Sequence, residues 1–272
     1  HSERGRHMLV RRLGPLRERE TWIDLLGVAL WVVLAAGGLA ATIFAPDDTS
    51  DVDQPVLLVT MTVFFALIIA RLVLAAWNWP NRRVGLIALA VGITLWATGS
   101  AILNAATPAS KTTFPAPGEW FFLASYVGMA AFLALDATNR ISGRRTAWLD
   151  AAIVVGSTGA IAGGVLLTPF ARNFPDGGLP LLVAIMFPLI DIVLALVVVG
   201  QWALSAREWS ARTLSLIVGF VLLAIADSSL FLNLSSGTYG FTIILDLVWG
   251  AGFTLIVAGA CAPRPPQLAV AR

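Results

Sequence analysis

The stretch LLVAIMFPLIDIVLALVVVGQWAL, residues 181–204, decides the class of fold. An apolar run of about 20 residues with few charges is long enough to cross a hydrocarbon core of ~30 Å as a helix. This run nevertheless holds Pro188 and, three positions later, Asp191. A charged side chain inside a bilayer costs at least ~2.5 kcal/mol, so the segment predicts a membrane span with a polar site at mid-depth.

Seven other runs of this kind occur along the chain, and the composition agrees with them. Hydrophobic residues make up 58% of the 272 and charged residues 12%, about half the charged share of a soluble domain. We therefore predict an all-α polytopic membrane protein with eight transmembrane helices. The predicted spans are 22–44, 56–77, 84–106, 120–135, 149–170, 181–204, 214–232 and 241–262.

Positive residues alternate along the predicted loops. Six arginines lie between Arg4 and Arg19, and others follow the second, fourth, sixth and eighth spans, whereas the remaining loops hold only Lys111 and Arg172. Because cytoplasmic loops carry the excess of Lys and Arg, both termini are predicted to be cytoplasmic, in a bacterial plasma membrane. The basic balance is explained by this topology and indicates no nucleic-acid partner.

The two halves of the chain share short motifs in register, which indicates a duplicated four-helix unit. Residues 22–38 match residues 148–164 through a Trp-x-Asp and a Gly-Gly pair, and GSAILN (99–104) resembles DSSLFLN (227–233). We therefore expect an N-terminal segment (1–20), a transmembrane domain (21–262) with halves 21–139 and 146–262, and a cytoplasmic tail (263–272). Residues 1–7 resemble a cloning junction and are left out of the interpretation.

The predicted spans contain no histidine and only one cysteine, so they lack residues suited to bind a metal ion or haem or to form a disulfide. Cys261 is the lone cysteine, and His1 and His7 both precede the first span. Neither a metal site nor a cofactor is expected, and no nucleophile–base pair predicts an enzyme.

Charged residues near the span ends are predicted to be structural. Asp24 and Asp150 start the first and fifth spans, where a carboxylate favours the helix N-terminus, and Asp136 is taken to end the fourth. Arg71 lies near the end of the second span and can reach the inner surface or pair with one of these acids.

Four acids in the outer half are the candidate ligand-binding residues, namely Asp191, Asp227, Asp246 and Glu119. Pro188 frees a backbone carbonyl and is predicted to kink its helix one turn from Asp191, which is tolerated only against protein or a water-filled cavity. We expect an outward-facing acidic pocket there. Its predicted lining is completed by Trp96, Asn104, Tyr126, Ser228, Ser229, Asn233 and Trp249. The alternative is that each aspartate makes one interhelical hydrogen bond and only fixes packing.

The segments FPAPGEWFFLASYVGM, AWLDAAIV, FPLIDIVLAL, LIVGFVLLAIADSSLFL and DLVWGAGFTLIVAGACAPR resemble a known family. Over about residues 80–265 the chain is similar to the N-terminal membrane region of actinobacterial signalling proteins that carry GGDEF and EAL domains. The resemblance implies an input module whose cytoplasmic output domains make or degrade cyclic di-GMP. It also implies that Glu119, Asp191, Asp227 and Asp246 occupy motif positions. No GGDEF or EAL sequence follows Arg272, so neither activity is assigned to this chain.

Three functions remain open at this point. The first is a sensory module that binds a small ligand, cation or proton and signals to a cytoplasmic output, as an attached domain or within a homodimer. The second is a small cation- or proton-coupled transporter with Asp191 as the coupling carboxylate. The third is a membrane scaffold or subunit that acts through helix contacts alone.

Overall fold

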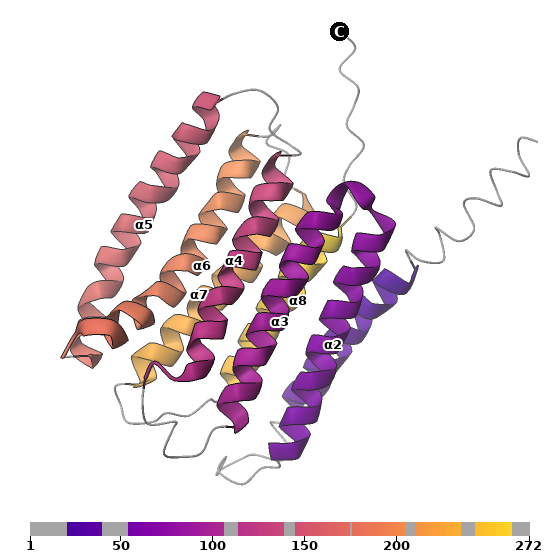
Figure 1. Ribbon diagram of the computed structural model, residues 1–272, viewed down its shortest axis with the longest axis horizontal. Coiled ribbons are helices and arrows are strands. Elements are labelled where there is room, and N and C mark those ends of the chain that lie inside the picture. Colours follow the sequence, from indigo (N-terminus) through magenta and orange to yellow (C-terminus); the bar gives the residue numbers. More distant parts are fainter. Residues whose placement is uncertain are drawn as a thin grey trace, which may run out of the picture.

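The computed structural model describes residues 21–39, 54–105, 114–138, 145–174, 176–204, 210–234 and 243–262. These residues form helices with a few turn residues, and no strand occurs among them. An N-terminal helix covers Thr21–Leu39. The others, in chain order, are α2 (Gln54–Asn78), a 3₁₀ turn η1 (Pro80–Arg82), α3 (Arg83–Ala105), α4 (Pro117–Thr138), α5 (Arg145–Asn173), α6 (Gly178–Leu204), α7 (Ala211–Leu234) and α8 (Ile243–Cys261) (Figure 1).

Six of the described helices are long and apolar enough to cross a membrane. They are the N-terminal helix and α2, α3, α4, α6 and α7, while the apolar part of α8 is the shorter segment Leu245–Cys261. The all-helical class and the membrane-spanning composition are therefore confirmed. Each predicted span falls on a helix, but the count of eight crossings stays a prediction.

The fourth predicted span is shorter at both ends than the helix that contains it. It was predicted as 120–135, whereas α4 begins at Pro117 and continues through Asp136 to Thr138. Proline fits the first helical position because its missing N–H would have no partner there. The predicted end at Asp136 falls two residues short of the observed end at Thr138. The Asp136 carboxylate is held by an arginine of another helix, as described below.

Helix α6 runs through Pro188 without ending. Proline cannot donate a backbone hydrogen bond, so the carbonyl of Ala184, one turn earlier, lacks its usual partner within the helix. The carboxylate of Asp191 follows less than one turn later and is fully buried. The free carbonyl of Ala184 and the Asp191 carboxylate are about 10 Å apart along the axis, so this apolar helix holds two polar groups.

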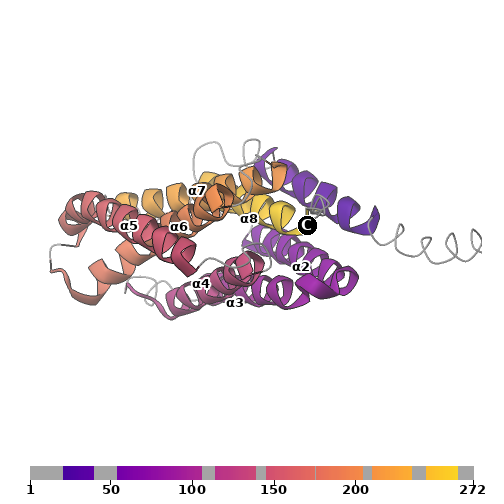
Figure 2. The same ribbon diagram turned by 90° about the horizontal axis from the view of Figure 1, so that it is seen from above.

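The helices form an elongated bundle in two layers. Seen from above, α2, α3 and α4 lie in one layer and α7 and α8 in the other, with α5 at one end of the bundle (Figure 2). Neighbouring helices in the chain pack most extensively, above all α3 with α4 and α7 with α8. The contacts of α2 with α8 and of α4 with α6 join the first four helices to the last four.

Glycines bring the two central helix pairs into close contact. A Cβ placed on Gly128 of α4 would lie 2.6 Å from the carbonyl oxygen of Ala88 and 2.6 Å from the Cα of Gly92, both on α3. A Cβ on Gly219 of α7 would lie 2.9 Å from the carbonyl oxygen of Gly252 on α8. Small residues are what permits such backbone contact between membrane helices, so α3–α4 and α7–α8 are tightly fitted pairs.

Gly128→Ala is expected to destabilise the protein by about 1–3 kcal/mol, because the new methyl group collides with backbone that cannot move aside. Thermal unfolding of the purified chain in detergent micelles measures this. Gly156→Ala on α5 is the matched control, since nothing lies within 4 Å of a Cβ there and alanine is the better helix former. Equal effects of the two changes would contradict the close fit of α3 and α4.

Candidate functional site

A tyrosine hydroxyl joins two buried carboxyl groups at the centre of the bundle. The Tyr126 hydroxyl lies 3.0 Å from Asp191 Oδ2 and 3.0 Å from Asp227 Oδ2. These side chains come from α4, α6 and α7, and their exposed fractions are 3%, 0% and 2% in that order. The sequence-based prediction that Asp191 and Asp227 converge therefore agrees with this geometry, and Tyr126 bridges them.

The hydrogen-bonding groups at this bridge must share protons. A phenol has one proton to donate, so it can satisfy one carboxylate, and the second contact requires a proton on the other carboxyl group. Asp191 Oδ1 is also buried without a hydrogen-bond partner among the described residues. Full satisfaction of the bridge thus requires at least one proton held between Asp191 and Asp227.

A fourth residue fixes the other side of Asp227. The indole Nε1–H of Trp249 on α8 donates to Asp227 Oδ1 at 2.7 Å. A continuous set of side-chain hydrogen bonds therefore runs from Asp191 through Tyr126 and Asp227 to Trp249. It links α6, α4, α7 and α8 in a region with little access to solvent.

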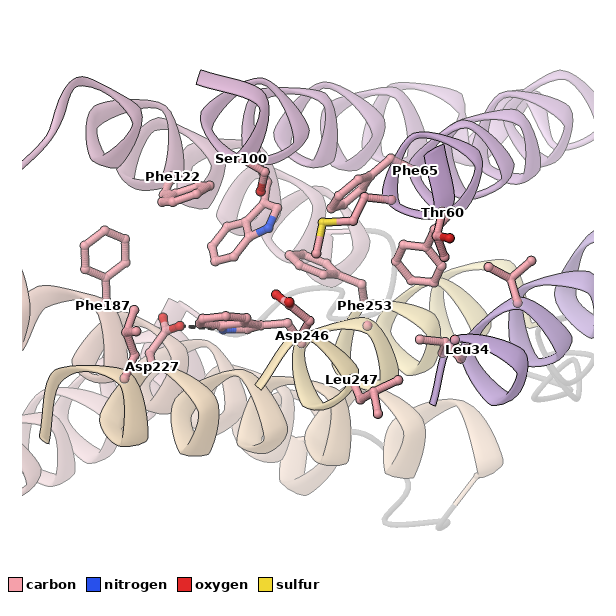
Figure 3. A pocket seen from close by; sticks show the side chains of 18 of the residues that line it. Leu34, Thr60, Phe65, Ser100, Phe122, Phe187, Asp227, Asp246, Leu247 and Phe253 are labelled. Carbon is pink, nitrogen blue, oxygen red and sulfur yellow. Dashed lines mark hydrogen bonds between the residues drawn. The ribbon is translucent and has the colours of Figure 1, made fainter. Parts of the chain in front are cut away.

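A cavity of about 120 Å³ lies on the Trp249 side of these residues. Side chains of the N-terminal helix, α2, α3, α4, α6, α7 and α8 line it, so both halves of the chain contribute. Figure 3 shows Asp227 and Asp246 on one side of the space and Phe122 and Ser100 on the other. Its aromatic lining residues are Phe64, Phe65, Trp96, Phe122, Phe187, Phe231, Trp249 and Phe253.

The charged groups of the cavity wall are all acidic. Glu119, Asp227 and Asp246 line it, and no lysine, arginine or histidine does so in the described part of the chain. The same part of the chain holds no group of three or more His, Cys, Asp or Glu placed to bind a metal ion. The acids therefore surround a space without converging on one point.

Trp96 connects the aromatic lining across the cavity. Its ring centre lies 4.3 Å from that of Phe122 on α4 and 5.1 Å from that of Phe253 on α8, with the second pair edge to face. Such aromatic pairs contribute about 0.5–1.5 kcal/mol beyond the area they bury. The cavity wall is thus held by contacts between helices of both layers.

The C-terminal end of α8 is held by two arginines, which we call the α8 clamp. Arg82 of η1 donates from Nη1 to the carbonyl oxygen of Ala262 at 3.1 Å and from Nη2 to that of Ala260. Arg212 of α7 donates from Nε to the carbonyl oxygen of Gly259 at 2.9 Å. Cations at a helix C-terminus satisfy its last carbonyl groups and interact favourably with its dipole.

A buried ion pair supports the clamp. Arg212 Nη2 lies 2.8 Å from Asp136 Oδ2, and both side chains are 4% exposed. Arg71 was predicted either to reach the inner surface or to pair with an acid. It lies against Gly27 of the N-terminal helix, and the described residues place no carboxylate within ion-pair distance of it. Asp24 is exposed. Asp136 is therefore structural as predicted, with Arg212 as its partner.

The remaining predicted residues fall into three groups. Glu119, Asp227, Asp246, Trp96 and Trp249 line the cavity, whereas Asp191 and Tyr126 do not and lie behind Asp227. Ser228 and Ser229 follow Asp227 on α7 but are not part of the lining. The side chains of Asn104, Asn233 and Asp150 lie outside the described part of the structure.

Sequence reasoning missed the α8 clamp and most of the aromatic lining. Arg82 and Arg212 were interpreted only as topology signals, although arginines near the end of a helical segment also predict capping of carbonyl groups. The sequence does not distinguish the phenylalanines of the cavity wall from those of the core, because both occur within apolar spans.

No protein-family model matches the chain, and comparisons with curated proteins and with solved structures found no match either. Composition, fold and the geometry of the cavity are therefore the basis for assigning a function.

Tyr126→Phe is expected to cost about 1–3 kcal/mol, because it leaves buried carboxyl oxygens without their donor. Combining it with Asp191→Asn in a double-mutant cycle should show a coupling of about 0.5–3 kcal/mol in chemical unfolding. The control cycle combines Tyr126→Phe with Gln201→Leu, which removes the separate bond from Gln201 Nε2 to the Leu133 carbonyl oxygen, and should be additive. Additivity in both cycles would contradict the bridge.

Asp136→Asn is expected to cost about 3–5 kcal/mol, since it leaves the buried Arg212 guanidinium without its counter-ion. The midpoint of thermal unfolding measures the loss. Asp176→Asn is the matched control, because this exposed carboxylate precedes α6 and takes no part in the clamp, and such a change alters stability by roughly 0.5 kcal/mol or less. A small, equal shift for both variants would show that the pair does not stabilise the fold.

Proposed function

We propose that the chain is a membrane-embedded sensory module, which binds a small ligand in the acidic cavity and relays binding to a cytoplasmic output through α8. It is a multi-pass protein of the bacterial plasma membrane in this proposal. Its eight spans form two four-helix halves, and both termini are cytoplasmic. The output is a GGDEF or EAL domain of the resembled family, attached or associated, or the partner copy in a homodimer.

One observation carries the proposal: the same helix lines the cavity and ends in the clamp. Helix α8 faces the cavity with Asp246, Trp249 and Phe253. The last carbonyl groups of α8 accept hydrogen bonds from Arg82 and Arg212. At 1.5 Å per residue, Asp246 and Ala260 are about 20 Å apart along the helix. A shift of α8 at the cavity is therefore felt at the clamp, from which the chain continues to residues 263–272.

The pattern of contacts supports the duplicated arrangement. The tight pairs α3–α4 and α7–α8 occupy equivalent positions in the two halves, and so do the contacts of α4 with α6 and of α8 with α2. An exchange of halves about an axis along the membrane normal relates each member to its equivalent. The cavity takes residues from both halves, as expected for a ligand site at such a seam.

The closed end of the bundle favours a sensor over a transporter. A transport path would have to continue past the last turn of α8. There the side chains of the Arg212–Asp136 ion pair are each 4% exposed, and arginines donate hydrogen bonds to the last carbonyl groups of α8. Opening it would expose or break a buried ion pair at a cost of several kcal/mol. Signalling requires only that the clamp shift, not that it open.

The native cysteine provides a direct test of the relay. Cys261 is the lone cysteine of the chain, lies in the last turn of α8 and is 5% exposed. Ser100→Phe fills the cavity from α3 and so imitates a bound ligand. We expect it to change the rate of maleimide labelling of Cys261 in nanodiscs about fivefold or more, as for coupling free energies of about 1–3 kcal/mol.

Val127→Phe is the control, because the side chain of Val127 is 72% exposed on the outer face of α4. It adds an aromatic ring away from the cavity and should leave the labelling rate unchanged. Unchanged labelling in both variants would contradict the relay and favour the scaffold. Flux of sodium ions or protons into vesicles reconstituted with the wild-type chain would favour the transporter.

A further inference from the structure

The acidic side chains of the cavity wall have no basic partner in the described lining. Among its described lining residues, Glu119, Asp227 and Asp246 are acidic and none is basic. Asp227 already accepts hydrogen bonds from Tyr126 and Trp249. Glu119 and Asp246 therefore differ from it, since neither carboxylate has a hydrogen bond or an ion pair with any residue that the structure describes.

Glu119 is the stronger indicator of a missing partner. Its side chain is 3% exposed, yet it borders the cavity from the first turn of α4. A buried ionised group without a partner costs several kcal/mol, so natural proteins retain one where a ligand or a proton completes it. Asp246 faces the same space from the first turn of α8, where Figure 3 shows it beside Phe253.

The lining does not suit a divalent metal ion as the partner. Calcium and magnesium require about six oxygen ligands at 2.0–2.6 Å. The described residues contain no cluster of acids placed to provide such ligands, and Thr60 and Ser100 are the only hydroxyl-bearing residues in the lining. Most of the lining is apolar, with eight aromatic side chains, so it suits a cation with an apolar surface.

Aromatic faces stabilise such a cation directly. An organic ammonium group within about 6 Å of the centre of a tryptophan or phenylalanine ring is attracted by the negative face of the ring. The rings of Trp96 and Trp249 lie 6.2 Å apart at the cavity, and Phe253 lies 5.1 Å from Trp96. An engineered cavity of about 150 Å³ holds benzene, so a space of about 120 Å³ takes a molecule of roughly that size.

We infer that the ligand of this cavity is a small organic ammonium cation, held by the Glu119 and Asp246 carboxylates and by the faces of the surrounding aromatic rings. The inference rests on the proposed ligand pocket and gives its chemical class. The positively charged nitrogen is the ion-pair partner of the Glu119 and Asp246 carboxylates. The methyl or methylene groups around the nitrogen contact the apolar wall. Asp227 stays hydrogen-bonded to Tyr126 and Trp249. It attracts the cation electrostatically without contacting it directly.

Choline and its uncharged analogue 3,3-dimethylbutan-1-ol provide the sharpest test, because they share a shape and differ in the charge of one atom. Isothermal titration of each probe into the full chain in nanodiscs gives their dissociation constants. We expect choline to bind about tenfold or more tightly than the alcohol. Glu119→Gln keeps the shape of the wall and should reduce that ratio toward one, mainly by weakening choline.

Two further variants keep the test decisive. Asp246→Asn replaces the second acid and serves if Glu119→Gln fails to fold. Asp24→Asn removes an exposed carboxylate in the N-terminal helix, outside the cavity lining, and should leave the choline-to-alcohol ratio unchanged. Sodium and magnesium chloride, titrated alone, measure the response to inorganic cations.

The outcomes separate the ligand class from the proposed function. Equal binding of choline and the alcohol would overturn the cationic class while leaving a ligand pocket. Binding of sodium or magnesium ions without choline would overturn it in favour of an inorganic ion. If no probe binds but Ser100→Phe still changes Cys261 labelling, the inference fails and the sensory relay stands.

Discussion

The hydroxyl group of Tyr126 is the interaction on which the centre of the bundle depends. It lies between two buried carboxyl groups that α6 and α7 bring from the second half of the chain, while Tyr126 belongs to α4 in the first half. Two acids with no nearby base are costly in an apolar interior, and the phenol and the indole of Trp249 lower that cost by hydrogen bonding. The bridge therefore fixes how α4 sits against α6 and α7, and through Trp249 it fixes α8 as well.

Different contacts hold different parts of the bundle: glycines pack the helices within each half, and aromatic rings pack the two halves against each other. Glycines let α3 approach α4, and α7 approach α8, at backbone distance, so each pair is rigid. The joins between the halves are less extensive, and large rings such as Trp96 and Phe253 fill the space there. These rings leave part of the seam unfilled. The cavity consequently lies at the seam between the halves and not inside either pair.

Hydropathy and spacing were sufficient for the helices and for part of the site. The membrane-spanning character of residues 181–204 and the convergence of Asp191 with Asp227 follow from an apolar run that carries an acid at mid-depth. The rotation of each helix could not be read from the sequence, because nearly every face of these spans is apolar. For that reason Asp191 was expected to face the pocket, yet it lies behind Tyr126 and Asp227. The partner of Asp136 was missed for a related reason, since the pairing with Arg212 depends on how the end of α4 meets the start of α7.

In the proposed relay, the position of Asp246 on α8 connects the cavity to the far end of the helix. Asp246 lies in the first turn of this helix and the clamp holds its last turn, so a force at either end acts on one rigid element. An empty cavity leaves the unpaired acids of α4 and α8 facing the same space. In the proposed binding mode, a cation between them attracts both carboxylates and draws the first turns of the two helices together. Because α4 also carries Asp136, the partner of Arg212, both α4 and α8 connect the proposed ligand site to the clamp.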